Sequence, residues 1–275
     1  MGYDQKKRQA PFLLCLLLVG AIGLDGKIYC VGGFIEENHT PVPDVSVYDP
    51  ATDSWQKLAP LPSPLGSVAL AALDGKIHAV GGRDTKSVGT HRVYDPATNR
   101  WSELAPLPQG RDHMGLVNVD GKLYAVGGRF NTFEYNTNLL DVYDPTKDSW
   151  SSAKPMPTAR SGSAVTVMDA KIFVFGGERL GGTFNQAEVY DPAANVWAEL
   201  APMPMSVHGT GAVTISETIY IPAGATLTSR RPLIMGENSA QSSVWPLGDL
   251  RNGRGPEHYP HKRVADSWPQ ESQKL

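Results

Sequence analysis

Cysteine is nearly absent from this sequence, and its scarcity argues against two classes of small stabilised domain. Cys15 and Cys30 are the only two cysteines among 275 residues. Two thiols provide neither a disulfide framework nor the paired Cys and His spacing of a structural zinc site. We therefore interpret both as buried, unbridged side chains and expect no metal site.

Clustered positive charge and long apolar runs are missing as well. Lys and Arg total 25 against 28 Asp and Glu, and the formal net charge is −3. Because nucleic-acid phosphates are held by clustered basic side chains, we expect no nucleic-acid partner. The apolar run at residues 12–22 is shorter than the roughly 20 residues that cross a bilayer as a helix, so no membrane span is expected.

The sequence does contain a nine-residue motif that occurs four times, which we call the repeated phrase. It reads VYDPATDSW (47–55), VYDPATNRW (93–101), VYDPTKDSW (142–150) and VYDPAANVW (189–197). Asp-Pro suits the first two positions of a type I turn, and the flanking Val, Tyr and Trp favour strands. Each copy therefore predicts two antiparallel strands joined by a short loop. The tyrosines recur at intervals of 46, 49 and 47 residues, which indicates an array of one repeated unit.

The segments around each phrase repeat too. The preceding segments read LDGKIYCVGG (24–33), LDGKIHAVGG (73–82), VDGKLYAVGG (119–128) and MDAKIFVFGG (168–177). Asp-Gly between apolar runs predicts a tight hairpin, and the double glycine predicts a sharp turn or a close backbone approach. A Pro-x-Pro segment follows each Trp and ends the strand there, because proline cannot donate to a ladder.

This combination resembles the kelch motif, with four copies over residues 24–204 and a weaker half-copy over 209–224. The resemblance implies an all-β, kelch-type β-propeller in which each copy is one four-stranded blade. In the fourth copy, strands A to D are expected at 163–168, 171–176, 188–191 and 197–201. The residues that recur in every copy are interpreted as structural: Gly32, Gly33, Gly81, Gly82, Gly127, Gly128, Gly176, Gly177, Tyr48, Tyr94, Tyr143, Tyr190, Trp55, Trp101, Trp150 and Trp197.

We divide the chain into a basic and apolar N-terminal segment (1–15), the propeller (16–225) and a tail (226–275). The tail is rich in Arg, Ser, Pro and Gly with little periodicity, so we expect it to be of low order. Kelch propellers usually close with six or seven blades. Only four blades and a fifth A–B hairpin are recognisable here, so we expect an incomplete or open arc.

Residues 1–23 have two interpretations. Lys6-Lys7-Arg8 followed by an apolar run resembles a secretory signal peptide, with Val19 and Ala21 at cleavage-site positions. Alternatively the run contains strand A of the first blade. A small residue falls five positions before the hairpin Asp, or before its equivalent in the half-copy, in every unit: Gly20, Ala69, Gly115, Ala164 and Gly211. The sequence does not decide between them, and it leaves a cytoplasmic and a secreted location open.

Candidate binding residues lie in the loops, where the copies differ. In kelch substrate-binding domains, residues after the double glycine and in the loop before strand A line one face and bind peptide. Carried over by position, the resemblance implicates Arg83, Arg111, His113, Arg129, Arg160, Ser161, Glu178 and His208. Arginine forks recognise carboxylates, so an acidic partner segment would suit them. Pro64 and Val207 take the Arg position of the loop in the other copies, which leaves the pocket incomplete by that standard.

The sequence favours a non-enzymatic interaction module that binds a partner protein or peptide and needs no cofactor. Kelch domains often form the substrate arm of ubiquitin-ligase adaptors. No BTB or F-box segment is expected ahead of residue 24, so that role would need a separate recruiting subunit. The alternative is an exported sugar-binding or sugar-modifying propeller similar to sialic acid mutarotase, with Arg160 and Glu178 as candidates. A copper radical oxidase is disfavoured, because no suitable His pair accompanies the two cysteines.

Overall fold

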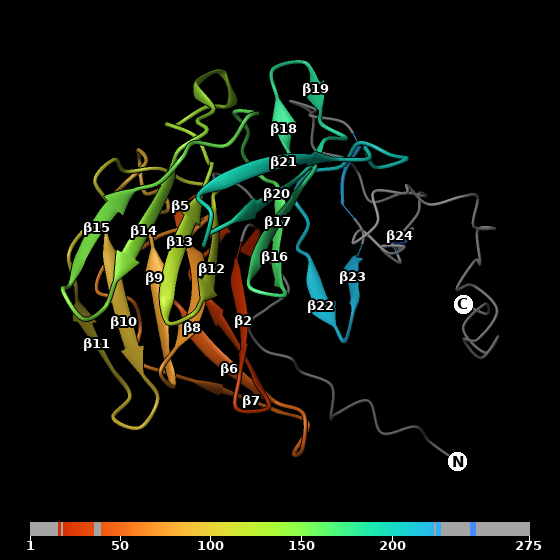
Figure 1. The fold of residues 1–275 in the computed structure, drawn as a ribbon. Coiled ribbons are helices and arrows are strands. Elements are labelled where there is room, and N and C mark those ends of the chain that lie inside the picture. The colour runs from red at the N-terminus through yellow and green to blue at the C-terminus, as the bar shows by residue number, and fades with distance from the viewer. Residues whose placement is uncertain (1–15, 18, 36–39, 223, 227–242, 246–275) are drawn as a thin grey trace, which may run out of the picture.

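The computed structural model of the chain describes residues 16–17, 19–35, 40–222, 224–226 and 243–245 (Figure 1). Within these residues the regular structure consists of β-strands and one short 3-10 helix, η1 (Phe133–Tyr135), with no α-helix. Four four-stranded antiparallel sheets and a smaller fifth sheet are arranged as blades around a common centre. The predicted all-β propeller fold is therefore confirmed.

Each complete blade runs from an inner strand A to an outer strand D. Blade one contains β2 (Gly20–Leu24), β3 (Lys27–Val31), β6 (Val45–Asp49) and β7 (Ser54–Lys57). Blade two contains β8 (Ala69–Leu73), β9 (Lys76–Val80), β10 (His91–Asp95) and β11 (Arg100–Glu103). Blade three contains β12 (Gly115–Val119), β13 (Lys122–Val126), β14 (Leu140–Asp144) and β15 (Ser149–Ser152). Blade four contains β16 (Ala164–Met168), β17 (Lys171–Phe175), β20 (Ala187–Asp191) and β21 (Val196–Leu200), each within one residue of its predicted range.

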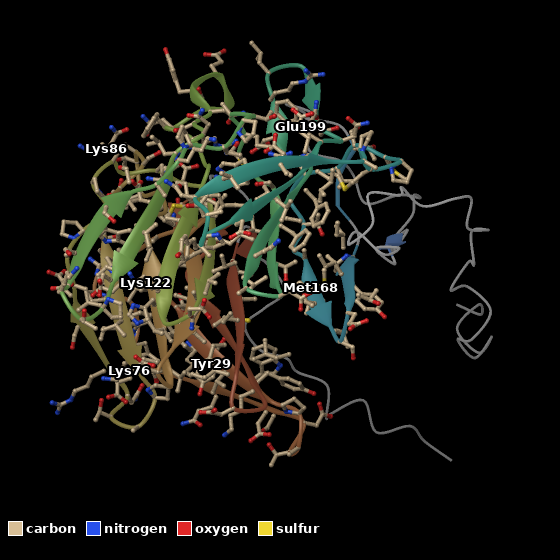
Figure 2. All side chains as sticks on the ribbon, in the orientation of Figure 1. Tyr29, Lys76, Lys86, Lys122, Met168 and Glu199 are labelled. Atoms are coloured by element: carbon tan, nitrogen blue, oxygen red, sulfur yellow. The ribbon has the colours of Figure 1, made fainter. Side chains whose placement is uncertain are left out.

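Short strands elaborate the loops that follow the double glycines. In blade one, β1 (Leu16–Leu17), β4 (Phe34–Ile35) and β5 (Thr40–Pro41) form a small sheet in the order β1-β4-β5. In blade four, β18 (Glu178–Arg179) and β19 (Gly182–Thr183) form a hairpin. These loops lie at the end of the propeller opposite the Asp-Gly hairpins. In Figure 2, Lys86 lies at the end of the propeller that carries these loops, and Lys76 lies at the end that carries the Asp-Gly hairpins.

Blade five has one more strand than the sequence predicts. The A–B hairpin consists of β22 (Val213–Ile215) and β23 (Thr218–Ile221), and β24 (Ser243–Trp245) pairs with β23. Trp245 stands opposite Ile219, the register that the strand C tyrosines take in the other blades. Thus β24 is strand C of blade five, although the tail has no Tyr-Asp-Pro phrase. The other residues of the predicted low-order tail, 227–242 and 246–275, lie outside the described residues.

The Asp-Gly pairs form the predicted tight hairpins. Both central residues have positive φ, for example 48° at Asp120 and 74° at Gly121, as a type I′ turn requires. The hairpin of blade four places Ala170 where those of blades one to three have glycine, at a φ of 54°. A side chain in this left-handed region costs on the order of 1 kcal/mol, so this turn stores local strain.

The aromatic residues of the repeated phrase join neighbouring blades. Each Tyr lies opposite the Trp of its own phrase, with ring centroids between 5.0 and 5.2 Å apart. In blades two, three and four the Trp indole N–H donates to a carbonyl of the preceding blade, on Ala59, Ala105 and Lys154 respectively. The backbone N–H of the same three residues donates to the side chains of Asn99, Asp148 and Asn195. We call this pair of hydrogen bonds the blade joint.

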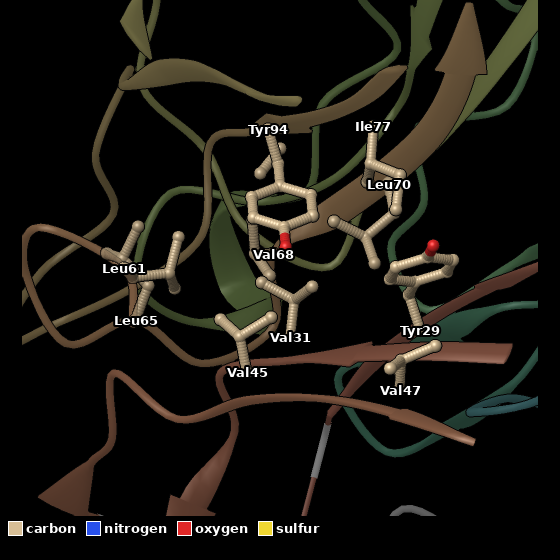
Figure 3. Packing of buried hydrophobic residues seen from close by; sticks show 11 residues of the cluster. Tyr29, Val31, Val45, Val47, Leu61, Leu65, Val68, Leu70, Ile77 and Tyr94 are labelled. Atoms are coloured by element: carbon tan, nitrogen blue, oxygen red, sulfur yellow. The ribbon is translucent and has the colours of Figure 1, made fainter. Parts of the chain in front are cut away.

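The core lies between the blades. Between blades one and two, Val31 and Val47 pack with Leu70 and Ile77, and Tyr94 closes the cluster (Figure 3). Equivalent clusters fill the next three junctions. Cys30 is buried and unpaired, as expected, and burial raises its pKa. Cys15 lies outside the described residues.

The described blades form an open arc. The inner strands follow one another as β2, β8, β12, β16 and β22, each packed against the next. At the free face of blade one, Ile28 is 44% exposed, whereas the residues in the same register in blades two to five are at 0%: Ile77, Leu123, Ile172 and Ile219. At the free face of blade five, Val213 and Ile215 are 47% and 57% exposed. Both ends of the array are therefore uncovered within the described residues.

The inner strand of blade one bears on the two interpretations of residues 1–23, a signal peptide or strand A. Residues 20–24 form β2, so the predicted strand A is confirmed. A Cβ on Gly20 would meet Leu70 and the Val68 carbonyl at 3.0 Å, which explains the small residue at this position. Residues 1–15 lie outside the described residues, and the signal-peptide interpretation of that segment stays a prediction.

Candidate functional site

The double glycines bring each blade against the loop of the next one. A Cβ on Gly81 would lie 2.4 Å from the Arg111 carbonyl oxygen, and one on Gly176 would lie 2.3 Å from that of Val207. The second glycine of each pair donates its N–H to the same carbonyl, as Gly82 does to Arg111 at 3.1 Å. Glycine is thus required here by close approach as well as by positive φ. This contact fixes the position at which the loop after each double glycine begins.

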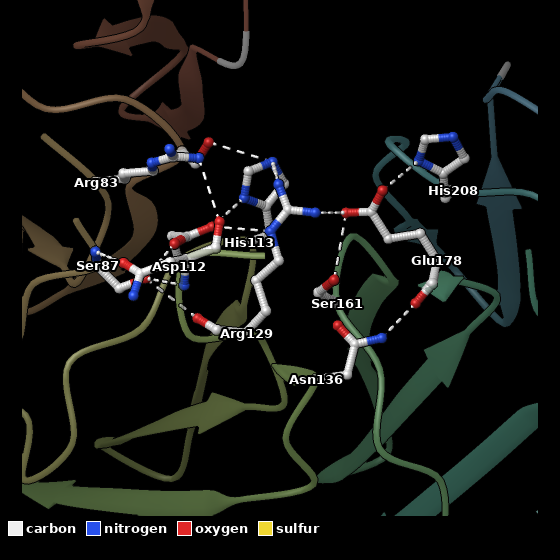
Figure 4. Close-up of polar contacts among 11 residues, drawn as sticks. Arg83, Ser87, Asp112, His113, Arg129, Asn136, Ser161, Glu178 and His208 are labelled. Carbon is white, nitrogen blue, oxygen red and sulfur yellow. Dashed lines mark hydrogen bonds and ion pairs between the residues drawn. The ribbon is translucent and has the colours of Figure 1, made fainter. Parts of the chain in front are cut away.

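The residues directly after the double glycines of blades two to four, together with Ala225 after Gly224 in blade five, form a row around the centre of one propeller face. Each pairs through backbone bridges with a residue of the loop before strand A in its own blade: Arg83 with Gly66, Arg129 with Asp112, Glu178 with Ser161, and Ala225 with His208. Residues from blades two to five therefore converge although they are far apart in the sequence. Side chains from this row form the candidate site (Figure 4).

Arg129 lies at the middle of the site, between two carboxylates. Its Nε contacts Asp112 Oδ1 at 3.1 Å, within its own blade. Its Nη1 contacts Glu178 Oε1 at 2.5 Å, across the junction with blade four. Its Nη2 lies 3.0 Å from Nε2 of His113. Since the guanidinium is buried and planar, it holds blades three and four in a fixed relation.

Two histidines flank this centre. His113 Nδ1 lies 2.5 Å from Asp112 Oδ1, and His208 Nδ1 lies 3.4 Å from Glu178 Oε2. The backbone of His113 has a φ of 54°, and the equivalent positions in the other blades, Ser67, Gly162 and Gly209, are also left-handed. The loop geometry thus places His113 in a conformation that usually favours glycine, with its side chain in the polar network.

Smaller polar residues complete the network. Ser87 donates its hydroxyl to Asp112 Oδ2, and Ser161 donates to Glu178 Oε1 at 3.2 Å. Asn136 donates its amide to the backbone carbonyl of Glu178 at 2.6 Å. Each carboxylate therefore accepts bonds from both a cation and a hydroxyl, which fixes its orientation.

The electrostatics of the site are balanced. Burial alone would raise the pKa of the Asp112 carboxyl, but hydrogen bonds from His113 and Ser87 and the charge of Arg129 hold that pKa below its ordinary value. Asp112 is therefore a carboxylate at neutral pH. Arg129 contacts both Asp112 and Glu178, and His113 and His208 each contact one of these two carboxylates.

Arg111 and Arg160 do not belong to this site, which corrects the sequence-based expectation. Both side chains are at 0% exposure inside their blades. Arg111 pairs with Asp141 at 2.8 Å and donates to the carbonyls of Gly127 and Ala125. Arg160 pairs in the same way with Glu188, also at 2.8 Å. These arginines join strands B and C of one blade, and burial lowers their pKa.

The alignment of the arginine position is also corrected. The carbonyls that receive the double-glycine N–H groups belong to Leu65, Arg111, Arg160 and Val207. Leu65, not Pro64, is therefore the counterpart of Arg111 in blade two. Leu65 and Val207 are buried, so this position is an interior one in all four blades.

The structure brings six of the eight predicted binding residues together: Arg83, His113, Arg129, Ser161, Glu178 and His208. Sequence reasoning missed Asp112, Ser87 and Asn136. Asp112 could have been found from its register, because it takes the same position in blade three as Ser161 and His208 take in theirs. Ser87 and Asn136 lie inside loops of unequal length, and no repeated spacing marks them.

Among the described residues, no group of three or more His, Cys, Asp and Glu side chains is arranged to hold a metal ion. No helix in the same residues is long and apolar enough to cross a membrane.

Comparisons with known proteins agree with the repeat structure. The Kelch motif family matches residues 17–62, 64–108, 110–157 and 159–204. Kelch-like protein 35 of Mus musculus is 38% identical over 97 residues, covering 33% of this chain and 15% of that protein. Kelch-like ECH-associated protein 1A of Danio rerio is 42% identical over 66 residues, covering 23% of this chain and 11% of that protein. The influenza virus NS1A-binding protein homolog of Mus musculus is 32% identical over 82 residues, covering 30% and 12% respectively.

A solved structure has the same fold over a larger share of this chain than these relatives cover. The structure of YjhT superposes with a TM-score of 0.67 at 21% identity, covering 77% of this chain and 73% of that chain. The curated relatives above are matched over only 11% to 15% of their own lengths, so their likeness concerns the repeats alone. Four motif matches spread over more than half of the sequence identify the family. The chain belongs to the kelch-repeat family.

Proposed function

We propose that the chain is a non-enzymatic interaction module that binds a partner protein or peptide over the polar row on one propeller face. The observation that carries this proposal is the convergence of Arg83, Arg129 and Glu178 from three blades onto one face. The names of two relatives also record association with another protein, one with ECH and one with NS1A. A rigid face built from several blades suits recognition of a segment longer than one side chain.

An acidic segment fits this face through Arg83. Arg129 is shared by two carboxylates, so these three groups contribute orientation and no net positive charge. Arg83 is half-buried at the edge of the row, and Nη1 donates to the Asn131 carbonyl at 3.3 Å. A guanidinium has five N–H donors in a planar fork, and this arrangement presents the others to a carboxylate of a partner.

A second candidate function is a sugar-binding or sugar-modifying propeller. Its supporting observation is the pair of carboxylate–imidazole contacts, Asp112 with His113 and Glu178 with His208. Such pairs can transfer protons to and from a hydroxyl at neutral pH. Faster interconversion of sugar anomers in the presence of the chain, followed by NMR, would favour this candidate over an interaction module.

The test is selection from a random peptide display library on the full chain. We expect the selected peptides to be enriched in Asp and Glu, and we expect Arg83→Glu to remove that enrichment. Lys86→Glu is the matched control, because Lys86 is exposed in the same loop but lies outside the row. Selection without acidic enrichment, or equal capture by Arg83→Glu, would contradict the acidic-partner proposal.

A further inference from the structure

Arg83, the residue to which the proposed function assigns recognition of an acidic segment, has a backbone that is fixed on both sides. It forms backbone bridges with Gly66, in the loop before β8, and with Ser87, at the far end of its own loop. The turn between these two partners is closed by Asp84, whose carboxylate accepts the Lys86 N–H at 2.9 Å. The backbone therefore places the Cα atom of Arg83, but it leaves the direction of the long side chain open.

That direction is set by the neighbouring blade. Nη1 of Arg83 donates to the backbone carbonyl of Asn131 at 3.3 Å, and within the described residues this is the one hydrogen bond of the guanidinium. Asn131 belongs to the loop after the double glycine of blade three, 48 residues further along the chain. The orientation of the Arg83 fork therefore depends on where blade three holds a single carbonyl group.

Two hydrogen bonds hold that carbonyl group in place. Oδ1 of Asn131 accepts the Ser87 N–H at 2.6 Å, and the Asn131 N–H donates to the Ser87 hydroxyl at 2.7 Å. We call this reciprocal pair the loop clasp, because it joins the loops of blades two and three. The same hydroxyl donates to the buried carboxylate of Asp112, which connects the clasp to the centre of the candidate site (Figure 4).

Asparagine meets two requirements at position 131. The backbone there has a φ of 65°, in the left-handed region that asparagine and glycine adopt more readily than most residues. The side-chain amide also provides an oxygen that can accept a backbone N–H, which glycine lacks. The backbone conformation and the hydrogen-bond acceptor can therefore be separated experimentally by the substitution Asn131→Gly.

We propose that Asn131 is a positioning residue that acts through Arg83 and determines the preference of this face for an acidic partner, an inference that rests on the proposed function. An arginine that is free to change rotamer must be ordered when a partner binds, and this weakens binding several-fold. The loop clasp orders the guanidinium beforehand. A carboxylate of the partner gains from this preorganisation, whereas a neutral amide in its place does not.

Calorimetric titration of the full chain tests the proposal with a library-selected acidic peptide and its twin, which has Gln and Asn in place of Glu and Asp. We expect Asn131→Gly to bind the acidic peptide about fivefold more weakly than wild type and the neutral twin equally well. Thr132→Gly is the matched control. Thr132 is exposed, lies in the same loop and makes no capping hydrogen bond to η1, so the control introduces a glycine without affecting the clasp.

A double-mutant cycle tests the route through Arg83. Arg83→Gln should weaken binding of the acidic peptide about tenfold, and the additional substitution Asn131→Gly should weaken it no further. NMR relaxation of the side-chain Nε provides a measurement that needs no peptide. We expect Arg83 to be more ordered than the exposed Arg100 in the wild-type chain, and as mobile as Arg100 in Asn131→Gly.

Three results would overturn the proposal: equal weakening of both peptides by Asn131→Gly, independent effects of the two substitutions, or an Arg83 side chain that stays ordered in Asn131→Gly. The first of these is the result of a merely structural role. A wild-type chain without any acidic preference would overturn the proposed function and this inference with it. A preference that is present in wild type and survives Asn131→Gly would overturn this inference alone.

Discussion

Arg129 and Glu178 connect blades three and four through an ion pair of 2.5 Å. The same guanidinium reaches Asp112 at 3.1 Å, so one buried cation is shared by two carboxylates from different blades. The centre of the candidate face is therefore preorganised: its charges are paired before any partner arrives. Our proposal assigns charge-specific recognition to Arg83, at the edge of the row.

Removal of the central cation should destabilise the protein in a pH-dependent way. Arg129→Ala leaves Asp112 and Glu178 without their shared partner, which we expect to cost about 3–5 kcal/mol of unfolding free energy at pH 7. Without the Arg129 charge the pKa of Asp112 rises, so protonation at lower pH relieves part of the repulsion. Chemical denaturation of mutant and wild type at pH 7 and pH 4.5 should show a smaller difference at the lower pH. A pH-independent difference would show that charge compensation is not the cause.

Arg111 should behave as a structural residue and not as a ligand contact. Arg111→Leu copies Leu65 of blade two but leaves the buried Asp141 unpaired, which should cost about 3–5 kcal/mol. The additional substitution Asp141→Ser removes the unpaired carboxylate and should recover most of the lost unfolding free energy. Serine is the residue at this register in blade one, as Ser46. Equilibrium unfolding of the single and double variants measures the coupling. Additive losses would mean that the ion pair does not determine stability here.

The buried histidine pair of blade two should make the protein sensitive to mild acid. His78 Nδ1 lies 2.9 Å from His91 Nε2, and His91 Nδ1 donates to the Ala105 carbonyl at 3.2 Å. Because a carbonyl only accepts, neutral His91 receives its second bond from His78. Burial lowers the pKa of both imidazoles to about 4.

The sign of the effect follows from the unfolded state, where histidine has a pKa near 6.5. As the pH falls from about 6.5 to about 4, these two histidines bind protons in the unfolded chain but stay neutral in the folded chain. The unfolding free energy should therefore drop by a few kcal/mol. His78→Tyr with His91→Leu copies the residues of blade three at the same registers, Tyr124 and Leu140. Thermal unfolding of this double variant should lose most of the pH dependence. An unchanged slope would assign it to other groups.

The strained hairpin of blade four offers a stabilising substitution. Ala170→Gly should raise the unfolding free energy by about 1 kcal/mol, because Ala170 has a φ of 54° where the hairpins of blades one to three have glycine. Gly121→Ala is the reciprocal control, since a Cβ there would meet nothing within 4 Å and would report the backbone cost alone. Denaturation midpoints of the two variants should move in opposite directions. Shifts in the same direction would remove φ strain as the explanation.

The repeats made the fold predictable from sequence, because the same turn and strand motifs occur in each of the four complete blades. Four concordant copies predicted the strand positions of blade four to within one residue. Strand β24 was missed, because Trp245 replaces the tyrosine that marks strand C elsewhere. Propensity alone cannot reveal a strand whose evidence is its register with β23.

The candidate site was only partly predictable, because position in a repeat does not determine exposure. Arg111 and Arg129 are both loop arginines of blade three, yet the first is enclosed by Asp141 and backbone carbonyls. The distinguishing signal was the acidic residue two positions before each tyrosine, Asp141 and Glu188, which provides a buried partner. Such a signal becomes readable only once strands B and C are known to lie side by side.

Calorimetric titration of the full chain with a library-selected acidic peptide tests the central claim most directly. The comparison uses the peptide, its twin with Gln and Asn in place of Glu and Asp, and the variants Arg83→Glu and Lys86→Glu. The account predicts that the acidic peptide binds wild type and Lys86→Glu about tenfold more tightly than its neutral twin, and that Arg83→Glu removes this preference. Equal affinity for both peptides, or a preference that survives Arg83→Glu, would contradict it.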